Sequence, residues 1–221
     1  MQIVGFPAGV FQTNCYIVAD DEGSCVIVDP GQEADAQVRK LVTENGWRPQ
    51  AVLLTHGHLD HIWNARQVAD HYRVPAYIHP DDREMLSDPA KAISMDVSQL
   101  LQGEEFGEPE TVVELFDGDN LQFGALAFDV DHVPGHSPGS VSFRTTVDTE
   151  QGEVQVVVGG DVLFDQGIGR TDLPGGDHEV LLASIQKKFF VLDDDAVVLP
   201  GHGPSTTIGR EKSENPFLRE L

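Results

Sequence analysis

Hydrophobic and polar positions in the first third of the chain follow strand spacing in some stretches and helical spacing in others. Helical spacing predicts a helix over residues 34–46, which stops at Gly46, and another over residues 60–72. Alternating or continuous apolar runs predict strands, the first two paired across the polar turn DDEGS, over residues 11–20, 24–31, 51–54 and 74–80.

The second half of the chain is rich in strands. Apolar stretches predict strands over residues 111–116, 120–133, 139–147, 153–160 and 196–200. A stretch with helical spacing, residues 177–190, precedes the last of them. This order fits a two-layer β core with helices outside, which is an α/β architecture. We interpret residues 1–221 as a single domain because no linker or low-complexity segment divides them.

The pattern of residues 80–110 predicts two short helices followed by an acidic loop. The apolar side chains of this segment would either pack on the core or overhang a pocket, and packing is favoured for Met85, Leu86, Ile93, Met95 and Leu100. The segment is a candidate insertion that covers a pocket.

Four apolar runs end in glycine-containing turns that carry histidine or aspartate. AVLL leads into THGHLDH, FDVDHV into PGHSPGS, VQVVVGG into DVLF, and AVVLP into GHGP. Loops at strand ends supply polar groups to sheets that are covered by helices, and glycine allows the backbone to turn tightly. We therefore expect these four turns to converge.

The spacing of these polar residues indicates metal binding. His56 and His58 are two apart and point to one side of an extended backbone, and Asp60 and His61 begin the next helix. Imidazole and carboxylate groups are suitable ligands for zinc. Seven candidates are too many for one tetrahedral ion and suit two ions that share a carboxylate: His56, His58, Asp60, His61, His136, Asp161 and His202.

The remaining histidines are predicted to be ordinary, with one exception. His71, His79 and His178 lie at the ends of predicted helices and strands and need no special role. His132 lies close to His136 and is a candidate supporting group rather than a ligand.

Charge limits the partners of the protein. Asp and Glu number 37 against 14 Lys and Arg, so the formal net charge is −23. Such a surface repels phosphate backbones and anionic lipid, so neither nucleic acid nor a membrane is an expected partner.

Cys15 and Cys25 are interpreted as reduced thiols. The N-terminus lacks a signal-peptide pattern and no apolar run reaches the ~20 residues of a membrane span, so we expect a cytoplasmic protein.

The four turn motifs, in this order between residues 55 and 204, resemble the metal-binding motifs of the metallo-β-lactamase superfamily. IVDPG at residues 27–31 resembles an earlier strand end of that family. The resemblance implies an αββα sandwich of two mixed β-sheets flanked by helices. GDVLFDQGIGRTDLPGGDH and GHGPSTTIGREKSENPFL look like the compact glyoxalase II-like hydrolases, which act on hydroxyacylglutathione thioesters.

The resemblance also assigns the ligands. A first ion is bound by His56, His58 and His136, a second by Asp60, His61 and His202, and Asp161 bridges the two. The implied cofactors are two divalent metal ions, with zinc preferred over iron or manganese, and the implied partner is a small-molecule thioester. Full-length glyoxalase II has an extra C-terminal helical region that helps to hold glutathione. Only about twenty residues follow His202, so the thiol carrier is left open.

The expected chemistry follows from two ions about 3.5–4 Å apart, which lower the pKa of a shared water toward about 7. The resulting hydroxide would attack the thioester carbonyl, and one ion would stabilise the oxyanion. Asp60 is expected to orient the nucleophile as well as to bind metal. Asp29 is a candidate support for the ligand loops, or an ordinary turn residue. Arg170 would either bind a substrate carboxylate or pair with Asp172 or another of the many surface acids.

Other functions fit the sequence less well. A mononuclear iron persulfide dioxygenase of the same fold is the alternative, because HxHxDH and GRTD resemble it too, although PGHGP followed by TT favours the hydrolases. β-Lactamases of this fold often carry Cys where Asp161 stands, and flavodiiron reductases carry Glu where His58 stands, so both are disfavoured. A structural zinc site is disfavoured because such sites are closed and rich in cysteine. The sequence predicts no oligomeric state.

Overall fold

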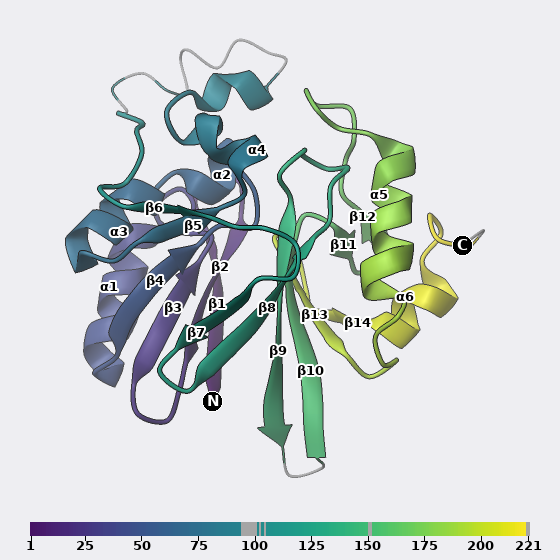
Figure 1. The fold of residues 1–221 in the computed structure, drawn as a ribbon, viewed down its shortest axis with the longest axis horizontal. Helices are drawn as coiled ribbons and strands as arrows, with labels where there is room; N and C mark the ends of the chain where they lie inside the picture. The colour runs from purple at the N-terminus through teal and green to yellow at the C-terminus, as the bar shows by residue number, and fades with distance from the viewer. Residues whose placement is uncertain (94–100, 102, 104, 150–151, 220–221) are drawn as a thin grey trace.

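Two six-stranded β-sheets pack against each other, and helices cover their outer sides (Figure 1). The structure is a computed structural model that describes residues 1–93, 101, 103, 105–149 and 152–219. Each sheet contains both parallel and antiparallel pairs. The predicted αββα sandwich of two mixed sheets is therefore confirmed.

The first sheet has its strands in chain order: β1 (Gln2–Ala8), β2 (Thr13–Ala19), β3 (Ser24–Val28), β4 (Arg48–Leu53), β5 (Ala76–Ile78) and β6 (Val112–Glu114). β2 and β3 form the predicted hairpin, with Ala19 opposite Cys25. The outer face is covered by α1 (Ala34–Asn45) and α3 (Ala65–Tyr72) (Figure 1). α1 ends as predicted at Gly46, which takes the left-handed conformation.

The second sheet has the order β14-β13-β10-β9-β8-β7. Its strands are β7 (Asn120–Phe123), β8 (Leu126–His132), β9 (Val141–Thr149), β10 (Gly152–Gly160), β13 (Val197–Pro200) and β14 (Thr206–Thr207). Beside it lie the two-stranded β11 (Leu163–Phe164) and β12 (Gly167–Ile168), and the helices α5 (His178–Ser184) and α6 (Ile208–Glu214). α5 continues into a π-helical turn, Ile185–Phe189.

β2, β3 and the second half of β4 are buried and largely apolar on both faces, because each face packs against a different layer. In β2, Cys15, Ile17 and Ala19 pack in one cluster with the helices, whereas Tyr16 and Val18 pack in another between the two sheets. A third cluster lies under α5. This packing holds the strand ends rigidly, which matters because the candidate ligands follow them.

Two elements differ from the sequence prediction. The helix expected over residues 60–72 is broken into α2 (Leu59–Ile62) and α3, because the backbone N–H of Asn64 bonds to Pro30 O at 2.9 Å instead of continuing the helix. β1 was not predicted. It contains Gly5 and Pro7, which weaken a strand pattern, and it lies at the sheet edge, where proline is tolerated.

Residues 80–92 form α4 (Pro80–Arg83) and two 3₁₀ turns, η1 (Glu84–Leu86) and η2 (Pro89–Ala92). Met85 and Leu86 are buried in the core cluster and Ile93 packs against it, so these side chains pack as favoured. Met95 and Leu100 lie outside the described residues, and a covering role for residues 80–110 stays a prediction. In the described part of the chain, no helix has both the length and the apolar character needed to cross a membrane.

Candidate metal centre

The predicted ligands meet where the ends of the two sheets face each other. His56 and His58 follow β4, and α2 carries Asp60 and His61. The other three follow strands of the second sheet: His136 after β8, Asp161 after β10 and His202 after β13. The sheets are joined at this edge by the bond from Val141 N to Thr55 O, 2.7 Å, and by a β-bridge between Thr13 and His202.

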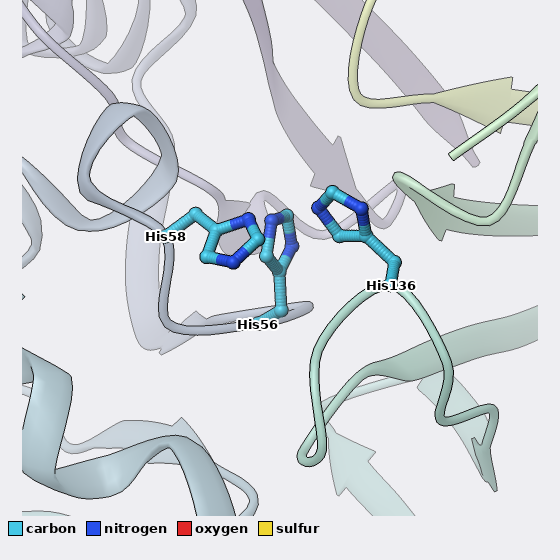
Figure 2. Close-up of side chains that lie close together, drawn as sticks. All are labelled: His56, His58 and His136. Atoms are coloured by element: carbon cyan, nitrogen blue, oxygen red, sulfur yellow. The ribbon is translucent and has the colours of Figure 1, made fainter. Parts of the chain in front are cut away.

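His56, His58 and His136 point toward one another from two loops (Figure 2). Their ring centroids lie 4.4–4.8 Å apart, and the ring planes cross at 77–81°. Because an imidazole lone pair lies in the ring plane, three nearly perpendicular rings can direct their nitrogens at a single point. The arrangement therefore suits one ion bound by three histidines.

Asp60, His61 and His202 form a second group with ligand atoms within 4.8 Å of one another. Asp60 Oδ2 lies 3.0 Å from His202 Nε2 and 3.4 Å from His61 Nε2. The hydroxyl of Thr13 donates to the same oxygen at 2.8 Å and holds the carboxylate in place.

The carboxylate of Asp161 lies between the two groups. Its Oδ1 is 3.3 Å from His61 Nε2, and its Oδ2 is 3.6 Å from His136 Nε2 and 3.5 Å from His202 Nε2. One side chain therefore contacts members of both ligand sets, as a bridging ligand must.

Hydrogen bonds at Nδ1 orient three of the imidazoles. His61 Nδ1 donates to Asp29 Oδ2 at 2.9 Å, and His136 Nδ1 donates to Arg170 O at 2.8 Å. His56 Nδ1 lies 3.0 Å from the Thr55 hydroxyl, which itself donates to Asp29. Such contacts fix the tautomer and leave Nε2 free for a metal.

Burial keeps His56 and His58 of the first set neutral. It lowers the pKa of His56 well below its ordinary value and that of His58 to about 3, and neighbouring histidines add to both effects. Metal binding requires neutral imidazole, so these two side chains are ready to bind at neutral pH.

Carboxylates dominate the second set. Burial alone would lower the pKa of His61, but Asp60, Asp161 and Asp29 outweigh it and raise that pKa well above its ordinary value. Burial would likewise lower the pKa of His202, yet its contact with Asp60 raises it. The pKa of Asp60 is in turn lowered by His61 against the effect of burial. A divalent ion would supply the positive charge that these carboxylates attract.

The donor set fits two metal ions. Nε2 of His56, His58, His61 and His136 and Oδ1 of Asp161 are buried without a hydrogen-bond partner among the described residues. Buried polar atoms are normally paired, and a bound ion would satisfy these. Nitrogen and oxygen donors without cysteine suit zinc, iron or manganese.

Within the described residues, His132 groups with His79 and Asp81 rather than with the seven candidate ligands. Its ring stacks on His79 with centroids 4.2 Å apart and planes at 5°, and its Nε2 donates to Pro138 O in the loop that carries His136. Together with Asp81 these histidines form a further group of potential ligands. Parallel ring planes share no common point, however, so this arrangement does not suit a metal ion.

The Arg170 side chain takes the second of its two expected positions. It is 60% exposed and forms a bidentate pair with Asp172 at 2.7 and 2.8 Å. At the metal centre itself, only the backbone carbonyl of Arg170 takes part, through His136. Substrate binding by the guanidinium stays a prediction.

Sequence reasoning missed two residues that hold the ligands. Thr13 contacts Asp60 from the first hairpin, and Asp82 accepts hydrogen bonds from both histidine loops. Both contacts join residues at least 25 apart in sequence, so no local pattern indicates them.

Comparison with known proteins agrees with this geometry. The sequence profile described as Metallo-beta-lactamase superfamily matches residues 8–202. Hydroxyacylglutathione hydrolase GloC of Haemophilus influenzae is 38% identical over 99% of this chain and 98% of its own length. Two solved structures each match 99% of this chain and their whole length. They are BLEG-1 B3 metallo-β-lactamase (TM-score 0.83, 42% identity) and TTHA1623 in a di-iron-bound form (TM-score 0.78, 36% identity).

Proposed function

The chain belongs to the metallo-β-lactamase superfamily and is a metal-dependent hydrolase, and we propose that it cleaves a thioester such as a hydroxyacylglutathione with two divalent ions. The position of Asp161 between the two ligand sets carries the binuclear part of the proposal. The relationship to GloC supports the substrate class. Zinc is the preferred metal, and the di-iron form of TTHA1623 makes iron the first alternative to test.

Two divalent ions at this centre would lower the pKa of a shared water and polarise the substrate carbonyl. A thioester suits such a site because a thiolate leaves without a strong general acid. Oδ2 of Asp60 is engaged by Thr13 and His202, so we assign to Oδ1 the task of orienting the attacking water.

The test is release of free thiol from S-lactoylglutathione by the metal-loaded protein. Asp60→Asn should lose most turnover, because the amide is a poorer acceptor for the water proton. Asp21→Asn, at a carboxylate that is 85% exposed, is the matched control and should keep wild-type turnover. Equal thiol release by the wild type and Asp60→Asn would contradict the proposal.

Arg170 is proposed to release Asp172 and to bind a carboxylate of the thiol carrier in its place. Arg170→Ala should then raise KM for an anionic thioester and leave a neutral one unchanged. Asp172→Asn frees the guanidinium and should lower KM for the anionic substrate. The same KM in all three proteins would place Arg170 outside the substrate site.

The likeness to BLEG-1 favours β-lactam hydrolysis as a second candidate, despite the aspartate at position 161. Hydrolysis of a chromogenic cephalosporin, assayed beside thiol release, distinguishes the two.

The dioxygenase alternative requires a single iron and consumption of oxygen with a persulfide. Elemental analysis and an oxygen electrode would reveal both.

A further inference from the structure

Asp82 in α4 is a fully buried carboxylate outside the ligand set. Its Oδ2 accepts from Gly57 N at 2.8 Å and from the Ser137 hydroxyl at 2.6 Å, and its Oδ1 accepts from Gly139 N at 2.7 Å. Three donors therefore converge on one side chain.

These donors belong to the two loops that carry the first metal site. Gly57 lies between His56 and His58 after β4 of the first sheet. Ser137 follows His136 directly in the loop after β8 of the second sheet. Asp82 thus links the part of the site that comes from one sheet to the part that comes from the other.

The contact is close. A Cβ added at Gly139 would lie 2.7 Å from the Asp82 carboxylate, so the loop can approach it only as glycine. The Ser137 hydroxyl is also 2.7 Å from that of Ser140, which closes a small buried network. Such networks hold their members in one geometry when every group is satisfied.

The charge of Asp82 has no cationic partner among the ion pairs of the described residues. A buried carboxylate is costly unless hydrogen bonds or positive charge compensate it. Three donors supply part of that compensation, and positive charge at the neighbouring metal centre would add to it.

We infer that Asp82 is a positioning residue for the first metal site, where it sets the distance between the His56–His58 loop and His136. The inference depends on the metal centre and not on the thioester proposal. Its test measures metal affinity, so neither its success nor its failure depends on the substrate.

Asparagine cannot replace this carboxylate. Both oxygens accept a backbone N–H, so the amide group of Asp82→Asn would face either Gly57 N–H or Gly139 N–H with a donor of its own. One loop would be pushed away while the volume of the side chain stays nearly the same.

The experiment places Asp82→Asn in two backgrounds and measures the zinc Kd by competition with a chelating dye. His202→Ala keeps the three-histidine site, and there Asp82→Asn should weaken zinc binding by about tenfold or more. His136→Ala keeps the second site, and there the Kd should stay nearly unchanged. Equal shifts in the two backgrounds, or no shift in either, would overturn the inference.

Glu211→Gln is the matched control. Glu211 in α6 is also fully buried and also accepts from three donors, but they come from Gln166, Thr206 and Asn215. Glu211→Gln should lower the unfolding temperature of the metal-free protein and leave both zinc affinities unchanged. A loss of first-site affinity as large as that of Asp82→Asn would show that any buried carboxylate has this effect, which overturns the inference.

Ser137→Ala tests the same contact if Asp82→Asn does not fold. It removes one of the three donors and keeps the carboxylate and the fold. In the His202→Ala background it should weaken zinc binding in the same direction and to a smaller extent. An unchanged Kd would again overturn the inference.

Discussion

The carboxylate of Asp29 lies 2.9 Å from Nδ1 of His61, and the two side chains are 2% and 0% exposed. The contact turns His61 Nε2 toward the other ligands. Asp29 also accepts the N–H and the hydroxyl of Thr55 at 2.8 and 2.6 Å. One carboxylate at the end of β3 therefore supports the end of β4 and a ligand on α2.

Asp29→Asn should weaken the second metal site. Asn tolerates the left-handed φ of 48° at this position, so the backbone is kept. With one acceptor lost, zinc affinity at that site should fall by about 10–100-fold. An unpaired buried donor should also cost about 1–3 kcal/mol in the free energy of unfolding. Chelator competition and urea titration measure the two effects, and an unaltered second-site Kd would contradict the role of Asp29.

Substitutions of individual ligands should empty the sites selectively. Asp161 contacts both sets, so Asp161→Ala should lower the content from about two metal ions per chain to nearly none. His136→Ala and His202→Ala should each remove mainly one ion. Elemental analysis after gel filtration is the measurement. A single tightly held iron that survives loss of His61 would count against a binuclear hydrolase.

Gly201→Ala should disrupt the centre. A Cβ there would lie 2.1 Å from Asp161 Oδ1, and the backbone cannot move away because Gly201 bonds to both Gly160 and Asn14. Gly203→Ala is the control, since its Cβ meets nothing within 4 Å and only its positive φ is strained. Gly203→Ala should lower the free energy of unfolding by about 1–2 kcal/mol, and the protein should keep its metal. Full metal content in Gly201→Ala would refute the steric argument.

The two cysteines should be unreactive in the folded protein. Both are fully buried and free. Burial raises the pKa of Cys25 to about 12 and that of Cys15 well above its ordinary value. At pH 8 both remain protonated, and the thiolate is the reactive form. A thiol reagent should therefore label neither before unfolding and both in denaturant. Rapid labelling of one thiol in the native protein would disagree with this burial.

The net charge of −23 should slow the approach of an anionic thioester. Raising the ionic strength from about 0.01 M to about 0.1 M shortens the Debye length from ~30 to ~10 Å and screens this repulsion. We expect kcat/KM for an anionic substrate to rise while kcat stays nearly constant, and a neutral thioester to show little change. Steady-state kinetics with circular dichroism as a control for the fold tests this. A falling kcat/KM would mean that attraction at the site dominates the approach.

Local patterns in the sequence were enough to predict the β2–β3 hairpin, the end of α1 at Gly46 and the turns that carry the seven candidate ligands. Each depends on residues close together in the chain: alternation along a strand, a glycine at a helix end, or the HxHxDH spacing. Family motifs supplied the arrangement of the two sheets.

Tertiary contacts decided the rest. The helix over residues 60–72 breaks because Asn64 N bonds to Pro30, and His132 stacks on His79 and bonds to the loop that carries His136. Asp82 joins two loops that lie 80 residues apart. A hydrogen bond between distant segments depends on where packing places both partners, so it leaves no periodic signal along the chain. For this reason the sequence indicated the candidate ligands and one side chain that supports them, Asp29, whereas the supporting contacts of Thr13 and Asp82 emerged only from the fold.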